Sequence, residues 1–306
     1  MSREELFQDR LAERHRRDRV FNIGTRVAMS VGFVALTVLL VGILVEGLPW
    51  LSWDFLDRYP SRFPEKAGFK AAFWGSLWVI GLTTLMTVPI GVAGAIYLEE
   101  YSKKGRFSQL VELLIANLAG VPSILYGMLG LIAFVRMFQT SPDPTTFFGI
   151  QLPFGRSVLA GTCTLSLLVL PVLTIASREA LRAVPDSLRQ AAFGLGSTRW
   201  QCVRYHVLPS AAPGILTGVV LSISRALGET APLVMMGALT YVAFTPSSVY
   251  DPFTAMPIQI FNWASRPQED FHSVAAAGII VLLTVLLGMN AIVVLLRNRA
   301  EKARIH

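Results

Sequence analysis

The chain has 306 residues, of which 53% are hydrophobic and 15% are charged, and its mean hydropathy is +0.53. About a quarter of the residues in an ordinary soluble domain are charged, so this composition excludes a disordered chain and disfavours a soluble enzyme. The net charge is +7, from 27 Lys and Arg against 20 Asp and Glu. Such a charge is typical of nucleic-acid binding or of the cytoplasmic loops of a membrane protein, and the positions of the charges distinguish the two.

Six apolar blocks are long enough to cross a bilayer as helices, for which about 20 residues are needed. They are Val27–Leu48, Phe73–Leu98, Leu110–Val135, Ser157–Ser177, Ala211–Phe244 and Val274–Leu296. The first block follows a basic stretch, as in a signal peptide, but its apolar run is too long and no small-residue cleavage site follows it. We therefore predict an all-α polytopic membrane protein with six transmembrane helices, the first of which is retained.

The basic residues are divided unevenly between the segments that connect these blocks. Segments 1–26, 99–109, 178–210 and 297–306 together hold 19 Lys and Arg, whereas the alternate segments hold 7. Because cytoplasmic loops are enriched in basic residues, both termini are predicted to be cytoplasmic. The expected organisation is therefore a cytoplasmic segment 1–26, a transmembrane domain 27–296 with its main cytoplasmic loop at 178–210, and a cytoplasmic tail 297–306. Nucleic acid is not needed to explain the charge.

The sequence shows no motif for covalent chemistry, nucleotide binding or metal binding. It contains no GxxxxGK[ST], GxSxG or HExxH pattern. Cys163 and Cys202 form no CxxC pair, and the four histidines are scattered. We therefore predict no catalytic residue, no metal site and no cofactor bound by this chain.

The main cytoplasmic loop is predicted to contain a short helix. Pro185 interrupts one helical pattern, and Ser187 followed by Gln190 has the spacing of a capping box that begins another. Gly194 and Gly196 are expected to end it. An apolar stripe at helical spacing consists of Leu188, Ala191, Ala192 and Leu195. Small residues on this face allow close approach of a partner; the alternative is an amphipathic helix that lies on the membrane.

This loop resembles the EAA loop of permease subunits in ATP-binding-cassette (ABC) importers, in which EAA is followed by three residues, Gly, nine residues, an aliphatic residue, any residue and Leu-Pro. The matching positions are Gln190, Ala191, Ala192, Gly196, Leu208 and Pro209. Two positions depart from the pattern, since Gln190 replaces the usual Glu and His206 replaces the aliphatic residue. The resemblance implies that the loop docks into a separate ATPase subunit, on which ATP is hydrolysed.

A charged pair lies inside the fifth apolar block. Arg225 and Glu229 are four residues apart, and Gly218 and Ser222 extend the same helical face toward the N-terminus. Ionisable residues within a span are costly and are functional by default, although a neutralised pair could instead only fix helix packing. We therefore assign the four residues to a translocation pathway. A guanidinium suits an oxyanion, and a carboxylate beside it suits an oxyanion that retains a proton, as phosphate does and sulfate does not.

The resemblance is closest to the permease subunits of phosphate importers. It is carried by Arg225–Leu233 (RALGETAPL), Gly120–Gly127 (GVPSILYG) and Pro257–Ala264 (PIQIFNWA), and it extends over nearly the whole chain. It implies a type I ABC importer permease fold in a bacterial or archaeal cytoplasmic membrane. It also implies a second permease subunit, two ATPase subunits and a phosphate-binding protein as partners, and a role for Arg225 and Glu229 in translocation.

Several interpretations stay open at this point. Pro122, Ser123 and Tyr126 in the third block could line the pathway or could form only a packing kink. Glu99 and Glu100, at the cytoplasmic edge, are expected to be solvated. The substrate could be another oxyanion such as sulfate or molybdate, and a carrier or channel driven by an ion gradient is the alternative from a different class.

Overall fold

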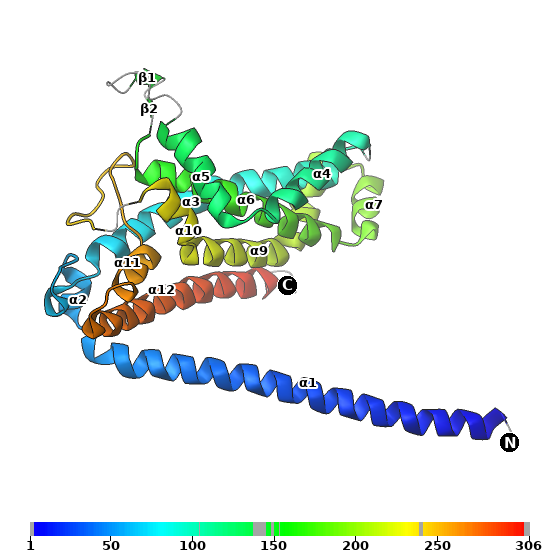
Figure 1. Ribbon diagram of the computed structural model, residues 1–306. Helices are drawn as coiled ribbons and strands as arrows, with labels where there is room; N and C mark the ends of the chain where they lie inside the picture. The colour runs from blue at the N-terminus through cyan, green and yellow to red at the C-terminus, as the bar shows by residue number, and fades with distance from the viewer. Residues whose placement is uncertain are drawn as a thin grey trace.

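The computed structural model describes residues 3–103, 105–136, 145–147, 150–152, 154–238 and 241–302. It is a bundle of long helices that run along one common direction, with α1 leaving the bundle (Figure 1). The helices are α1 (Arg3–Gly47), α2 (Trp53–Asp57), α3 (Lys70–Ile96), α4 (Arg106–Ala119), α5 (Ser123–Gly130), α6 (Val158–Arg182), α7 (Asp186–Gly194), α8 (Arg199–Cys202), α9 (Leu208–Gly228), α10 (Ala231–Met236), α11 (Met256–Ala264) and α12 (Glu269–Lys302).

The remaining elements are short. Two 3-10 turns cover Leu48–Trp50 and Pro64–Lys66, and π-helical turns cover Tyr97–Tyr101, Leu131–Arg136 and Val203–Val207. Strands β1 (Thr145–Phe147) and β2 (Ile150–Leu152) form an antiparallel pair in which Thr145 faces Leu152. The predicted all-α class is therefore confirmed, with one small hairpin added.

Five helical segments are long and apolar enough to cross a membrane, and a bent pair can form a sixth crossing. The five are Arg14–Trp50, Lys70–Tyr101, Val158–Arg182, Arg199–Gly228 and Glu269–Leu295. The bent pair is Arg106–Ala119 with Ser123–Arg136, which meet at 99°. The third predicted span is thus broken, at the point where Gly120 ends α4 and Pro122 precedes α5.

The directions of α3 and α6 favour a crossing by the bent pair. The N-terminal ends of both helices lie against one segment, with Gly75 of α3 against Thr254 and Ser157 before α6 bridged to Pro252. Their C-terminal ends meet in the ion pair between Glu99 and Arg182. Two parallel spans require that the chain between them return through the bilayer. The bent pair is long and apolar enough for that return, which is consistent with the six predicted crossings.

The fifth predicted span ends earlier than expected. It was predicted to continue to Phe244, but α9 ends at Gly228 and Glu229 has an extended backbone (φ −76°, ψ 117°). Proline lacks a backbone N–H and is tolerated in the first turn of a helix but not in its interior, and Pro232 is the second residue of the separate helix α10. Gly237, with φ +90°, ends α10 in a left-handed conformation that glycine adopts without strain.

Helix α1 is much longer than the bilayer is thick. Its 45 residues correspond to about 68 Å at 1.5 Å per residue, and it runs without a break across the predicted boundary between 1–26 and 27–296. Near its end, Gly47 packs on α12, where a Cβ would lie 2.7 Å from the backbone of Ala276 and Ala277. The preceding part of the apolar segment is exposed along its length and leaves the bundle (Figure 1).

Candidate functional site

Arg225 and Glu229 form an ion pair at the end of α9. The Nε of Arg225 donates to Oε1 of Glu229 at 3.2 Å, and the side chains are 36% and 19% exposed. Arg225 lies in the last turn of the helix, whereas Glu229 is the first residue beyond it. The pairing was expected from the spacing, but the two residues do not share one continuous helix. The break leaves both charges paired and partly accessible.

The two sequence motifs of the membrane domain meet beside this pair. Gly127 of α5 lies against Pro232 of α10, so close that a Cβ on Gly127 would be 2.6 Å from the Cα of Pro232. Tyr126 is buried, donates its hydroxyl to the carbonyl of Leu118 at 2.7 Å and lies within electrostatic reach of Arg225. The structure therefore brings GVPSILYG and RALGETAPL together, as Figure 1 shows for α5 and α10.

The other members of the predicted pathway have different surroundings. Pro122 is exposed at the beginning of α5, and Ser123, its first residue, is half-buried. Gly218 lies against α6, where a Cβ would be 2.8 Å from the Cβ of Ala176. Ser222 is 3% exposed and lines a small cavity between α3, α6 and α9. The burial of Gly218 and Ser222 favours a role in helix packing.

Three hydroxyls in that cavity have no hydrogen-bond partner among the described residues. They belong to Thr83, Thr87 and Ser222. A buried hydroxyl without a partner costs about 1–3 kcal/mol, so this contact of α3 with α9 is less stable than an apolar one.

The helix predicted in the main cytoplasmic loop is α7, but it begins differently from the expectation. Pro185 is the residue before the helix and Asp186 its first residue, so Ser187 lies within the first turn and does not cap it. The predicted capping box of Ser187 and Gln190 is therefore wrong. A capping box is present instead at α8, between Thr198 and Gln201.

The two sides of α7 differ in exposure. Leu188 and Ala192 pack inward against the core, whereas Gln190 and Ala191 are exposed. The helix ends where Gly196, at φ +81°, donates its N–H to the carbonyl of Phe193 at 2.9 Å. Gly196 thus has its expected role, while Gly194 is the last helical residue. At the end of the EAA-like frame, Leu208 is half-buried at the start of α9 and Pro209 is exposed.

Large apolar side chains are exposed on the same loop, at the end of the bundle. We define the cytoplasmic patch as Phe193, Leu195, Trp200 and Tyr205, which are 46%, 87%, 54% and 62% exposed. Leu195 and Ala191 of the stripe predicted for partner docking are exposed, whereas its other two members, Leu188 and Ala192, face inward. Large apolar side chains that are exposed in a loop outside the spans are candidates for a protein interaction site. The patch therefore favours partner docking for this loop.

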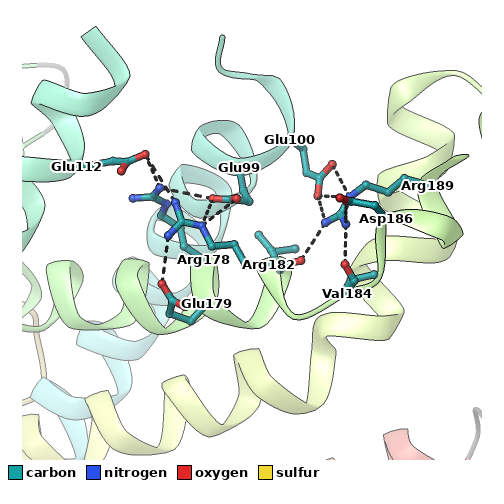
Figure 2. Close-up of polar contacts among 10 residues, drawn as sticks. Glu99, Glu100, Glu112, Arg178, Glu179, Arg182, Val184, Asp186 and Arg189 are labelled. Atoms are coloured by element: carbon teal, nitrogen blue, oxygen red, sulfur yellow. Dashed lines mark hydrogen bonds and ion pairs between the residues drawn. The ribbon is translucent and has the colours of Figure 1, made fainter. Parts of the chain in front are cut away.

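A cluster of ion pairs beside α7 was not expected from the sequence (Figure 2). Glu99 and Glu100 were expected to be solvated, but their side chains are 19% and 10% exposed and paired with arginines. Their partners, Arg178, Arg182 and Arg189, are 79 to 89 residues away along the chain. Local spacing carries no signal for such distant pairs. The i, i+4 spacing of Arg178 and Arg182 at the end of a span is the one hint that the sequence contained.

The cysteines and the acidic residues do not form a metal centre in the described part of the chain. Cys163 and Cys202 are free thiols, the first half-buried and the second buried. Within the described residues, no group of three or more His, Cys, Asp or Glu side chains could hold a metal ion. That the chain binds no metal or cofactor stays a prediction.

Comparison with known proteins assigns the fold and the family. Residues 88–302 match the family described as binding-protein-dependent transport system inner membrane component. The chain is 31% identical over 264 residues to the phosphate transport system permease protein PstA of Haemophilus influenzae, which covers 86% of this chain and 88% of that one. It is 35% identical over 210 residues to the probable ABC transporter permease protein YqgH of Bacillus subtilis. That match covers 68% of this chain and 62% of the other.

The same fold occurs in a crystal structure of a bacterial ABC transporter involved in the import of the acidic polysaccharide alginate, with a TM-score of 0.66 and 16% identity. The match covers 95% of this chain and 99% of that one. The chain therefore belongs to the inner-membrane permease components of binding-protein-dependent ABC importers, which are non-catalytic, multi-pass transport subunits that work with separate ATPase subunits and a binding protein.

Proposed function

We propose that this chain is the PstA-type permease subunit of an ATP-driven phosphate importer. Its partners are then a PstC-type permease subunit, two PstB-type ATPase subunits and a PstS-type phosphate-binding protein. The order of the motifs is more similar to that of PstA than to that of PstC. Relatives named as PstA in Haemophilus influenzae and Pasteurella multocida, 31% and 32% identical over most of the chain, support this substrate. Because the chain belongs to an ABC importer family, we no longer consider a carrier driven by an ion gradient.

The observation that carries the proposal is the partly exposed pair of Arg225 and Glu229 at the break between α9 and α10. The guanidinium presents several donors in a plane, which suits the oxygens of an oxyanion. The carboxylate accepts a hydrogen bond from an oxyanion that carries a proton and repels one that does not. Phosphate near neutral pH retains a proton, whereas sulfate has none, so the pair favours phosphate.

We assign Arg225 and Glu229 to the pathway, with Tyr126 beside them and Pro122 and Ser123 at the start of α5. A break in a helix frees backbone groups, which are tolerated within the membrane only against protein or a hydrated path. The transported ion can meet such groups where α9 ends and α10 begins. Gly218 and Ser222 then support this site by holding α9 on α3 and α6.

The energy for transport comes from ATP hydrolysed on the ATPase subunits. The cytoplasmic patch and the exposed Gln190 and Ala191 of α7 dock into that subunit. When the two ATPase subunits close on ATP, the docked helices move and the spans alternate between inward- and outward-open states. Such a change requires that the docked loop make different contacts in the two states.

The test is uptake and ATPase stimulation by the reconstituted full importer with phosphate-loaded or sulfate-loaded binding protein. Glu229→Gln should lower phosphate uptake by about tenfold to a hundredfold, because a hydrogen bond to a charged group contributes about 1.5–3 kcal/mol. Glu46→Gln is the matched control, since Glu46 is exposed near the outer end of α1. Equal stimulation by phosphate and sulfate would identify a general oxyanion permease, and unchanged uptake in Glu229→Gln would remove the assigned role of this residue.

A further inference from the structure

The last turn of α3 presents two neighbouring glutamates to two different elements. Glu99 and Glu100 lie in the π-helical turn Tyr97–Tyr101. Glu99 accepts from Nε of Arg182 on α6 at 2.9 and 3.0 Å, whereas Glu100 is paired with Arg189 on α7 at 2.8 Å (Figure 2). The π-helical turn that follows α3 is therefore joined both to α6, which is a membrane span, and to α7, the helix proposed to dock into the ATPase subunit.

The first set of ion pairs joins three membrane helices into one block. Arg178 of α6 is 7% exposed and donates through Nη2 to Glu112 of α4 at 2.6 Å and to Glu99 of α3 at 3.5 Å. Arg182, one turn later, contacts Glu99 and, at 3.8 Å, Glu112. The cytoplasmic ends of α3, α4 and α6 thus share one cluster of charges and are held together.

Arg189 attaches α7 to this block through all three of its guanidinium nitrogens. Nε and Nη2 donate to Glu100, Nη2 also donates to the carbonyl of Leu181 at 2.9 Å, and Nη1 donates to the carbonyl of Val184 at 2.7 Å and to Asp186 at 3.0 Å. The side chains of Arg189 and Glu100 are 16% and 10% exposed, so solvent screens the pair weakly. The hydrogen bond to Glu100 raises the pKa of Arg189 above its usual value, and an arginine is charged at physiological pH even without such a shift.

The backbone connection between α6 and α7 is short. Residues 183–185 separate the two helices, and Pro185 prevents them from forming one continuous helix. Apart from this connection, Arg189 reaches the end of α6 at Leu181 and the end of α3 at Glu100. Arg189 therefore contacts the ends of both spans, beside the apolar contacts that Leu188 and Ala192 make.

We propose that the Arg189–Glu100 ion pair is a strut that positions the docking helix and transmits its displacement to α3. The proposal rests on the docking role assigned above to α7, but not on phosphate as the substrate. Arg189 directly precedes Gln190, which is the first residue of the EAA-like frame. The guanidinium of Arg189 points inward to Glu100, at the end of α3. From α3, the movement reaches α9 and the Arg225–Glu229 pair across the contact that contains Thr83, Thr87 and Ser222.

The first experiment measures phosphate transported per ATP hydrolysed by the reconstituted full importer. Arg189→Gln and Glu100→Gln should each retain ATPase subunits and ATPase activity but lower this ratio by at least about fivefold, within the 5- to 150-fold range of typical coupling free energies. The double variant should be no worse than Arg189→Gln alone, because both changes remove one interaction. Asp186→Asn is the matched control: it removes an exposed partner of Arg189 and should change the ratio by less than about twofold.

The second experiment does not depend on the substrate. Spin labels at Ser187→Cys on α7 and Ser102→Cys at the end of α3, with Cys163 and Cys202 replaced by serine, report the distance between the two helices. In the importer with the native strut, this distance should be the same with and without a non-hydrolysable ATP analogue. In Arg189→Gln it should change on addition of the analogue.

These results separate the strut from the proposed substrate. If the importer does not transport phosphate but the distance between the spin labels stays constant, the strut is supported and phosphate is excluded as the substrate. A distance that changes with nucleotide in the native complex overturns the strut, as does an unchanged transport ratio in both single variants. The strut would also be overturned if the variants lost binding of the ATPase subunits in parallel with transport. The Arg189–Glu100 ion pair would then serve only to fold the loop.

Discussion

Pro232 occupies the space in which a side chain on Gly127 would stand. The Cα and the carbonyl oxygen of Pro232 are each 2.6 Å from the position of a Cβ on Gly127, and the Cβ of Met235 is 2.8 Å from it. This contact holds α10 on α5, and α10 begins two residues after Glu229. The absence of a side chain at position 127 therefore helps to determine where the Arg225–Glu229 pair lies.

Gly127→Ala should destabilise the protein and impair transport. The added methyl group meets backbone atoms that cannot rotate away, and overpacking of this kind costs about 1–3 kcal/mol. Thermal unfolding in detergent and uptake by the reconstituted importer measure the two effects. Gly81→Ala in α3 is the control, since a Cβ there meets nothing within 4 Å and alanine favours the helix by up to about 1 kcal/mol. Equal behaviour of the two variants would contradict the tight contact.

Ser222→Ala distinguishes packing from pathway at this position. The hydroxyl is buried and lacks a partner among the described residues, so its removal should leave transport intact and raise stability by up to about 1–3 kcal/mol. The melting temperature and the rate of phosphate uptake are the measurements. A loss of uptake at unchanged stability would instead place Ser222 on the pathway.

Leu195→Asp should prevent binding of the ATPase subunit. Leu195 is the most exposed member of the cytoplasmic patch, at 87%, and a central apolar anchor contributes about 2 kcal/mol or more to an interface. The affinity should fall at least about thirtyfold, measured by titration of the purified ATPase subunit onto the permease in nanodiscs. Phe63→Asp, at an apolar residue that is 53% exposed in the opposite, outer segment, should have no effect. Equal losses in both variants would argue against docking at the patch.

The outer segment before α11 should open in acid. The carboxylate of Asp251 accepts hydrogen bonds from the N–H groups of Ser247 and Ser248 at 2.8 and 2.9 Å and from the Ser247 hydroxyl at 2.9 Å. These bonds hold the pKa of Asp251 below its usual value of 3.8. A group with a depressed folded pKa contributes stability above the unfolded pKa and loses it as the pH falls through the folded value.

The hydrogen-exchange protection factor of segment 245–252, which is the exchange rate corrected for its intrinsic dependence on pH, should therefore be high at neutral pH and fall only below about pH 4, where carboxylates become protonated. Asp251→Asn should have a low protection factor already at neutral pH and show no further acid step. An acid step that persists in this variant would assign the transition to another group.

The apolar segments of this protein could be located from the amino-acid sequence alone, and the structure shows them as five long helices and one bent pair. A helix in lipid satisfies its backbone hydrogen bonds internally, so the length of an apolar block is a local property that predicts a span without knowledge of its neighbours. The unequal distribution of Lys and Arg predicts the orientation for the same reason. The pairing of Arg225 with Glu229 also follows from local spacing, as does the left-handed Gly196 that ends α7.

Only the tertiary structure decided how the broken spans pack together and which side chains face inward. The contact between Gly127 and Pro232, which lie far apart in sequence, places α5 of the bent pair against α10. The inward direction of Glu99 and Glu100 depends on arginines that approach only when α3, α6 and α7 pack together. Composition reports the preference of a segment for lipid or water, whereas a charge-to-charge contact requires the partner helix to be in place.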